Sequence, residues 1–296
     1  MRAHVPLLLS LLGIVLGAAL VEALALSARG GFDWKSAAIS VGDLLGRRLP
    51  LLLGVSTSGA LLGVVWRFRM QTLHVDGGAM LLLLFVGQEF CYYWYHRASH
   101  RIRWFWLTHS VHHSPNDLTL AAAFRIGWLQ HLTGAIVFFA PLVWLGFPPQ
   151  LVIITLSLNL LYQFWLHATW IPRLGWLEYV FNTPSAHRVH HAANIEYLDA
   201  NYGGVLVVFD RLFGTYVHER EDLPCRYGLV HAQTSHNILR VEFDPWIALA
   251  RDLLRARSAR EVLGAVFAPP GWRAQGDGET TEDLRRRAAC SDPRGG

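Results

Sequence analysis

Apolar blocks of membrane-spanning length dominate the first two thirds of the chain. Residues 5–26, VPLLLSLLGIVLGAALVEALAL, form an apolar run in which Glu22 is the only charge. About 20 such residues can cross the hydrocarbon core of a bilayer as a helix. Four further runs have a similar character, and they are residues 49–66, 79–95, 132–147 and 150–171. The pattern therefore predicts five spans, although a cleaved signal peptide is an alternative for the first.

The later runs indicate which side of the membrane the polar residues occupy. Pro148 and Pro149 separate the last two runs, which is the pattern of a helical hairpin that returns to the side where it began. The third run ends at His96 and the hairpin ends at His167, so both histidines are expected on one side. Arginines accompany this side between residues 97 and 188, and the positive-inside rule makes it cytoplasmic. We predict an all-α integral bundle in a bacterial cell membrane, with its N-terminus outside and a helical cytoplasmic cap.

Two helix starts are predicted within the cap. Thr183 and Pro184 supply an N-cap followed by a proline at the first helical position. Asp244 and Pro245 repeat this signal before the amphipathic segment 244–256, DPWIALARDLLRA. Its apolar face, formed by Trp246, Leu249 and Leu253, is expected to pack on the cap, and the alternative is a helix that lies on lipid headgroups.

Charge and cysteine content exclude several classes of protein. Lys35 is the only lysine among 26 basic residues, and the formal net charge is +4. The arginines flank apolar blocks and are not interleaved with aromatic residues, so nucleic acid is not an expected partner. Cys91, Cys225 and Cys290 lack the close spacing of a metal knuckle or redox pair, and we expect reduced thiols.

Three compact groups of histidines stand close to the ends of the apolar blocks. His96 and His100 are four residues apart, whereas the other two groups have the spacing i, i+3, i+4. These two groups are His109, His112 and His113, and His187, His190 and His191. On a helix such positions share one face about 5–6 Å apart, so their ring nitrogens can converge on metal at about 2 Å.

Together with His167, these imidazoles exceed the needs of one metal ion and suit two. Imidazole binds iron, zinc and copper alike, so the type of ligand does not identify the metal. A haem reductase would use isolated histidines from separate spans, and a transporter would place its ligands near the bilayer midplane. A dinuclear catalyst for lipid substrates is the favoured interpretation, and a zinc hydrolase or a metal transporter is the alternative.

The motifs around these histidines resemble the fatty acid hydroxylase and sterol desaturase superfamily over residues 79–220. The motifs are EFCYYWYHRASH (89–100), HSVHH (109–113), LYQFWLH (161–167), HRVHH (187–191), NYGG (201–204) and FDRLFGTY (209–216). The resemblance implies a membrane di-iron oxygenase that hydroxylates a fatty acyl, sterol or ether lipid, or desaturates it.

By this resemblance nine histidines would bind two iron ions, with no catalytic residue beyond these ligands. They are His96, His100, His109, His112, His113, His167, His187, His190 and His191. Glu89 and Gln163 are candidates for orienting a ligand imidazole. Gly203 and Gly204 permit a close backbone approach, Asp210 and Arg211 are a candidate ion pair, and His236 is a candidate tenth ligand.

Partners and the division of the chain follow from the same interpretation. The chain shows no GxGxxG opening a strand and helix, so an external ferredoxin or cytochrome with its reductase is expected to deliver electrons. Candidate docking residues are Arg220, Arg226 and Arg240, and candidates at the mouth of the lipid pocket are Asn116, Phe124 and Trp128. The predicted parts are transmembrane segments 1–78, a catalytic domain 79–243, an amphipathic helix 244–267 and a disordered tail 268–296.

Overall fold

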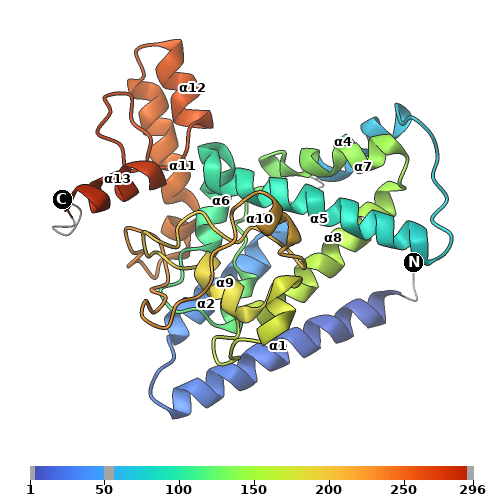
Figure 1. Ribbon diagram of the computed structural model, residues 1–296, viewed down its shortest axis with the longest axis horizontal. Helices are drawn as coiled ribbons and strands as arrows, with labels where there is room; N and C mark the ends of the chain where they lie inside the picture. Colours follow the sequence, from blue (N-terminus) through green and yellow to red (C-terminus); the bar gives the residue numbers. More distant parts are fainter. Residues whose placement is uncertain (1–3, 50–56, 292–296) are drawn as a thin grey trace.

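The computed structural model describes residues 4–49 and 57–291, and its regular structure is helical (Figure 1). Within these two ranges there is no β-strand, and pairing of the strand type is limited to isolated bridges such as Phe181 with Leu206. The prediction of an all-α fold is confirmed. Three long helices form the body, and they are α1 (His4–Ala28), α5 (Gly78–Arg101) and α8 (Pro149–Phe164).

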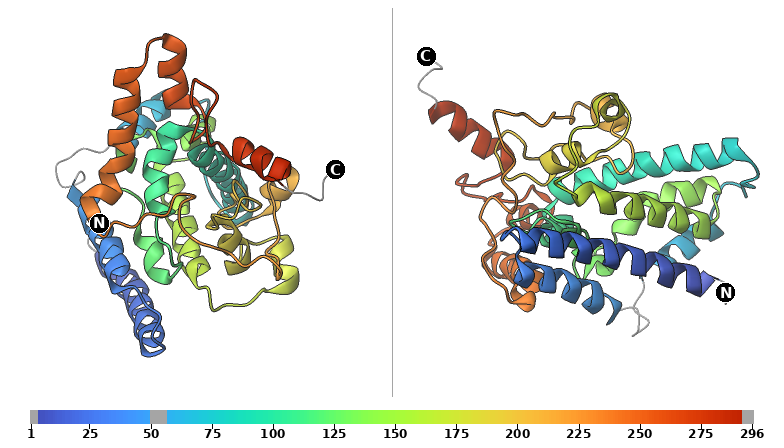
Figure 2. Two further views of the ribbon diagram at one scale, coloured as in Figure 1. Left: turned by 90° about the vertical axis from the view of Figure 1, so that its left-hand side faces the viewer. Right: turned by 90° about the horizontal axis from the view of Figure 1, so that it is seen from below.

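The other elements surround these helices. Those before α8 are α2 (Trp34–Gly46), α4 (Thr57–Arg67), α6 (Arg103–His112), η1 (Leu120–Phe124), η2 (Gln130–Leu132), η3 (Ala135–Phe139) and α7 (Ala140–Leu145). Those after it are η4 (Trp165–His167), η5 (Gly175–Tyr179), α9 (Pro184–His190), α10 (Val208–Leu212), α11 (Ile238–Arg255), α12 (Ala259–Phe267) and α13 (Thr281–Ser291). In Figure 2 (right), α1, α5 and α8 extend toward one end of the molecule, and α13 lies at the other.

Among the residues that the structure describes, two helical segments are long and apolar enough to cross a membrane, namely Ser10–Ala28 and Pro149–His167. The expected run 132–147 is not one helix, because η2, η3 and the six-residue α7 divide it. Run 49–66 lies partly outside the described residues, and α4 covers its remaining part. The number of five spans therefore stays a prediction, as does the cytoplasmic position of the cap.

A buried carboxylate ties α1 to the rest of the molecule. Glu22 accepts hydrogen bonds from the backbone N–H of Leu120 at 2.6 Å and from the indole of Trp170 at 2.9 Å. A carboxylate removed from water is costly unless it is hydrogen-bonded. The single charge of the first apolar run therefore fixes this helix against η1 and the segment after η4.

The C-terminal part differs from two expectations. Helix α11 begins at Ile238 with Asn237 as its N-cap and continues through Pro245, so the predicted start at Asp244 is wrong. A proline within a helix removes one backbone hydrogen bond, and packing of Trp246, Leu249 and Leu253 with Leu107 offsets this loss. The predicted packing on the cap is thus confirmed.

Residues 268–291 are also ordered, in contrast to the prediction of a disordered tail. The side chain of Asp283 accepts hydrogen bonds from Thr280 at the start of α13. Arg285 of this helix donates to the carbonyl oxygens of Ile195 and Leu198, and Glu282 pairs with Arg101. The charges that suggested disorder instead attach α13 to the cap.

Candidate metal centre

All nine predicted histidines come together in two groups where α5, α6, η4 and α9 meet. The first group holds His96, His100, His109, His113 and His190, and the second holds His112, His167, His187 and His191. Within each group the candidate ligand nitrogens lie within 4.8 Å of one another. Seven of the rings are buried, and His109 and His112 are half-buried.

Local helix geometry positions these rings as the spacing predicted. His96 and His100 stand on the last two turns of α5, and α6 ends with its own histidine motif. Thr183 caps α9 by accepting a hydrogen bond from Ala186 N, with Pro184 at the first helical position, as predicted. The short α9 thereby delivers His187 and His190, and His191 follows as its C-cap.

Backbone carbonyl groups orient four of the imidazoles through Nδ1. His96 faces Tyr202 O at 2.9 Å, His112 faces Arg125 O at 2.8 Å, His167 faces Gln163 O at 3.0 Å and His190 faces Ala200 O at 2.9 Å. A carbonyl oxygen only accepts hydrogen bonds, so Nδ1 carries the proton in each of these rings. The Nε2 lone pair of each neutral ring is then free to bind metal.

The arrangement of the ring nitrogens fits a metal ion in each group. The Nε2 atoms of His96 and His109 lie 3.0 Å apart, and those of His113 and His190 lie 3.1 Å apart. Two further buried nitrogens, Nε2 of His100 and of His191, have no hydrogen-bond partner in the part of the chain that the structure describes. Lone pairs that face one another without enough protons between them are stabilised by a cation.

Burial favours the uncharged form of these rings. Removal from water holds the pKa of these imidazoles well below the ordinary histidine value, and the neighbouring imidazoles lower the pKa further. This applies to His109, His113, His187, His190 and His191. A neutral imidazole is the form that donates its lone pair to a metal.

The NYGG segment forms a tight loop beneath the first group. Asn201 has a left-handed backbone, with φ of 58°, and its amide donates to Ala186 O and Val217 O. A Cβ on Gly203 would collide with Leu206 O, and one on Gly204 would collide with the Asn159 amide. The predicted close backbone approach is confirmed, and it brings the carbonyl of Tyr202 to His96.

Two buried carboxylates hold this loop, and neither has its predicted partner. Glu89 accepts hydrogen bonds from Val205 N, Leu206 N and the Asn159 amide, and within the described part of the chain no hydrogen bond joins it to an imidazole. Asp210 accepts from Tyr202 N, Gly203 N and Thr215 Oγ1, although burial raises its pKa to about 6. The predicted ion pair of Asp210 with Arg211 is wrong, because Arg211 donates instead to the carbonyls of Glu178 and Tyr179.

An apolar cavity of about 420 Å³ borders both histidine groups. Its walls include His109, His112 and His167 together with apolar side chains of η3 and α8. The residues predicted at the mouth of the lipid pocket, Asn116, Phe124 and Trp128, do not line this cavity. Phe124 stacks on Phe164 in a buried cluster, Trp128 packs on Gly46, and Asn116 donates to Gln233 O.

Sequence reasoning missed several residues around the site and overestimated one. Asp199 Oδ1 lies 3.6 Å from His100 Nδ1, and the Tyr92 ring is 5.4 Å from the His96 ring. Asp199 has a left-handed backbone that no motif signalled, and Tyr92 lies within a motif that was noted for its histidines and for Glu89. His236 lies outside both groups, half-exposed and 3.4 Å from Asp33.

The sequence of this chain is similar to a known protein family and to several known proteins. Residues 81–215 match the family model for fatty acid hydroxylase. Human alkylglycerol monooxygenase is 36% identical over 244 residues, which are 82% of this chain and 54% of that protein. The Xenopus tropicalis alkylglycerol monooxygenase is 35% identical over 209 residues, 70% of this chain and 46% of that protein. An ornithine lipid hydroxylase from Rhizobium tropici is 30% identical over 136 residues, 46% of this chain and 41% of that protein.

The fold and the histidine site define a class of helical membrane proteins that gather imidazoles beside an apolar cavity. The matches specify it further, and the chain belongs to the fatty acid hydroxylase and sterol desaturase superfamily. It spans about half the length of the curated alkylglycerol monooxygenases that it matches. No solved structure matches it.

Proposed function

We propose that this protein is a membrane-bound, O₂-dependent lipid hydroxylase with a di-iron centre. The convergence of nine imidazoles in two groups, beside an apolar cavity, carries this proposal. The absence of cysteine and carboxylate from both groups favours a metal that accepts an all-imidazole shell.

The two groups define which side chains would hold each ion. His96, His100, His109, His113 and His190 would hold the first, and His112, His167, His187 and His191 the second. Two iron ions bound there would supply the oxidant that inserts one oxygen atom of O₂ into a C–H bond. The carbonyl groups of Tyr202, Arg125, Gln163 and Ala200 fix the ring tautomers before metal binds.

The apolar cavity beside the histidines would place one carbon of a lipid chain next to both groups, and we call it the substrate cavity. Ile153, Leu156 and Leu160 of α8, with Ile136 and Phe139 of η3, provide an apolar wall. An alkyl chain that fills this space excludes water from the reacting carbon. Because α8 belongs to a segment that is long and apolar enough to span a membrane, we propose that the lipid enters the cavity directly from the bilayer.

The relatives support a lipid substrate and favour hydroxylation over desaturation. Their names describe an alkylglycerol monooxygenase and an ornithine lipid hydroxylase. Both names denote the oxidation of a lipid. The proposed electron donor is an external ferredoxin or cytochrome that approaches the cap from the cytoplasmic side.

The experiment that tests this function follows the metal and the product together. Protein expressed with ⁵⁷Fe is reduced anaerobically, mixed with O₂ and examined by Mössbauer spectroscopy. The same protein is incubated with ¹⁸O₂ and an alkylglycerol or an ornithine lipid, and the product is analysed by mass spectrometry. We expect two coupled ferrous sites that oxidise together and one ¹⁸O atom in the lipid. Zinc bound at the site of protein purified from iron-loaded cells would contradict the proposal, and so would bound iron that does not react with O₂.

A further inference from the structure

A second cavity reaches the histidines from the cap. It measures about 260 Å³, and we call it the cap cavity. His100, His113 and His190 border it, whereas His109, His112 and His167 border the substrate cavity. Among the residues that the structure describes, the two cavities share no lining residue. The histidine centre therefore has two separate approaches.

The lining of the cap cavity combines apolar side chains with polar and charged ones. Asp199, His231, Glu279 and Thr281 contribute polar side chains. Asp199 lies beside His100 and accepts a hydrogen bond of 2.7 Å from Arg101. Charged and hydroxyl groups at the wall of a cavity favour ordered water over an alkyl chain.

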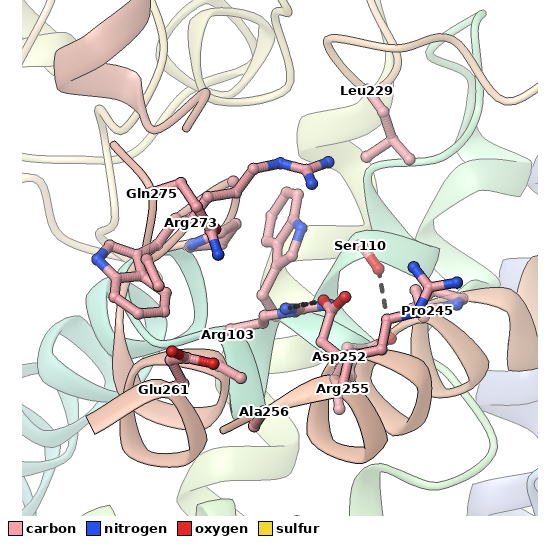
Figure 3. Close-up of a pocket in the computed structure, with 18 residues that line it drawn as sticks. Arg103, Ser110, Leu229, Pro245, Asp252, Arg255, Ala256, Glu261, Arg273 and Gln275 are labelled. Carbon is pink, nitrogen blue, oxygen red and sulfur yellow. Dashed lines mark hydrogen bonds and ion pairs between the residues drawn. The ribbon is translucent and has the colours of Figure 1, made fainter. Parts of the chain in front are cut away.

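A larger cleft of about 500 Å³ adjoins the cap cavity, and we call it the outer cleft. The two spaces share Trp106, Leu229, Pro270 and Gly271 as lining residues. Figure 3 shows the charged side chains around the outer cleft, with Arg103 paired to Asp252 at 2.6 Å. The other charged groups of this lining are Arg255, Glu261 and Arg273. The charged lining therefore favours water in the outer cleft, which adjoins the cap cavity.

Trp106 stands where the two spaces meet. Its ring lies 5.2 Å from the ring of His100 and 5.6 Å from that of His113. The C-terminal segment completes the wall, since Pro269, Glu279 and Leu284 line the cap cavity. The attachments of Glu282 to Arg101 and of Arg285 to Ile195 O and Leu198 O hold this segment in place.

The stoichiometry of the proposed reaction requires such a route. Hydroxylation consumes RH, O₂, two electrons and two protons, and it yields ROH and one water molecule; the external one-electron donor is oxidised twice. A lipid chain in the substrate cavity closes that side to protons and to the departing water. The polar reactants and product need a path that the lipid does not occupy.

We propose that the outer cleft and the cap cavity form an aqueous inlet, through which water, protons and small hydrophilic ligands reach the His100, His113 and His190 side of the centre. The proposal rests on the proposed function for its purpose, but the route itself is a property of the fold. It assigns a role to the ordered C-terminal segment, which forms one wall of the inlet.

The first test follows a small anion into the iron-loaded ferric protein. Azide binding is measured by stopped-flow absorbance in Val230→Trp and Leu284→Trp, which narrow the cap cavity. Leu156→Trp narrows the substrate cavity, and Leu263→Trp on the exposed surface of α12 is the matched control. We expect the first two variants to slow azide association at least ~10-fold. Leu156→Trp is expected to weaken lipid binding only, and Leu263→Trp to change neither. Slow azide entry in Leu156→Trp alone would overturn the inlet.

A second test does not depend on the metal. Leu198 lines the cap cavity and Ile136 lines the substrate cavity. Each is replaced by cysteine in a background where Cys225 and Cys290 are serine, since Cys91 is buried. A charged, water-soluble thiol reagent is expected to modify Leu198→Cys much faster than Ile136→Cys. If the reagent modifies neither thiol faster than the other, the inlet is overturned, whether or not the protein contains iron. If the thiol of Leu198→Cys reacts rapidly but the protein binds no iron, only the proposed function is contradicted.

Discussion

One carboxylate oxygen of Glu89 lies 2.8 Å from the backbone nitrogen of Val205, 116 residues further along the chain. The same oxygen accepts from Leu206 N, and the other accepts from the amide of Asn159. Glu89 is on the same helix as His96, and the loop it holds contains Tyr202, whose carbonyl orients His96. The carboxylate therefore acts on the histidine through the backbone of the loop.

Replacing Glu89 by glutamine should weaken this support. The amide has one acceptor oxygen where the structure uses two, so one buried donor loses its partner. Such a loss costs about 1–3 kcal/mol. We expect a lower midpoint of thermal unfolding together with reduced iron content, measured on purified protein. Glu196→Gln, at an exposed position of the cap, is the control and should match the unaltered protein. Full iron content in Glu89→Gln would mean that the support of the loop by Glu89 is not needed for metal binding.

Gly204→Ala should disturb the same loop by crowding. The added methyl group would meet the Asn159 side chain, which is itself bonded to Glu89 and Gln163. Overpacking of a buried site costs about 1–3 kcal/mol. Gly31→Ala is the matched control, because nothing lies within 4 Å of its added Cβ. Thermal unfolding of both variants should show a loss only for Gly204→Ala, and equal stability would contradict the close approach.

The two histidine groups predict which histidines control metal content. His187→Ala removes a nitrogen from the second group, whereas His236→Ala changes a residue outside both groups. Loss of a hydrogen bond that merely supports a ligand reduces metal affinity about 10- to 100-fold. Loss of the ligand itself should exceed this range. Metal analysis and titration with iron should show the deficit in His187→Ala alone; a similar deficit in His236→Ala would mean that the site extends beyond the two groups.

The helical class and the grouping of the histidines could be predicted because both depend on the spacing of residues that are close in sequence. The i, i+3, i+4 positions share a helix face whatever the rest of the chain does, and Thr183 caps α9 through its immediate neighbours. The amphipathic face of Trp246, Leu249 and Leu253 was equally local, and it packs as expected.

The partners of these histidines could not be predicted, because four of the rings are oriented by backbone carbonyls, whose positions depend on the path of the chain and not on the identity of a side chain. Arg125 O at His112 and Ala200 O at His190 carry no side-chain signal. Asp210 stands next to Arg211 in sequence, yet its carboxylate turns to the loop at Tyr202. The ordered C-terminal segment was missed because Arg285 donates to carbonyl groups that are 90 and 87 residues away in sequence.

A pair of buried carboxyl groups supports the backbone behind His112. Asp43 of α2 accepts hydrogen bonds from Ile126 N at 3.1 Å and Gly127 N at 2.9 Å. Glu242 of α11 accepts from Trp128 N at 2.9 Å. Burial and the facing carboxyl group of Asp43 raise the pKa of Glu242 well above its ordinary value, although the guanidinium of Arg125 opposes this shift. Arg47 also carries a charge close to the pair.

This pair predicts a loss of stability as the pH rises. The folded protein keeps a proton on Glu242 at pH values where the unfolded chain, with a pKa of about 4.3, has released it. The folded state then binds more protons, so the free energy of unfolding falls with rising pH by at most about 1.4 kcal/mol per pH unit. Glu242→Gln mimics the protonated acid and should remove this slope. Thermal unfolding of both proteins between about pH 5 and pH 8 measures it, and parallel curves would mean that Glu242 titrates alike in both states.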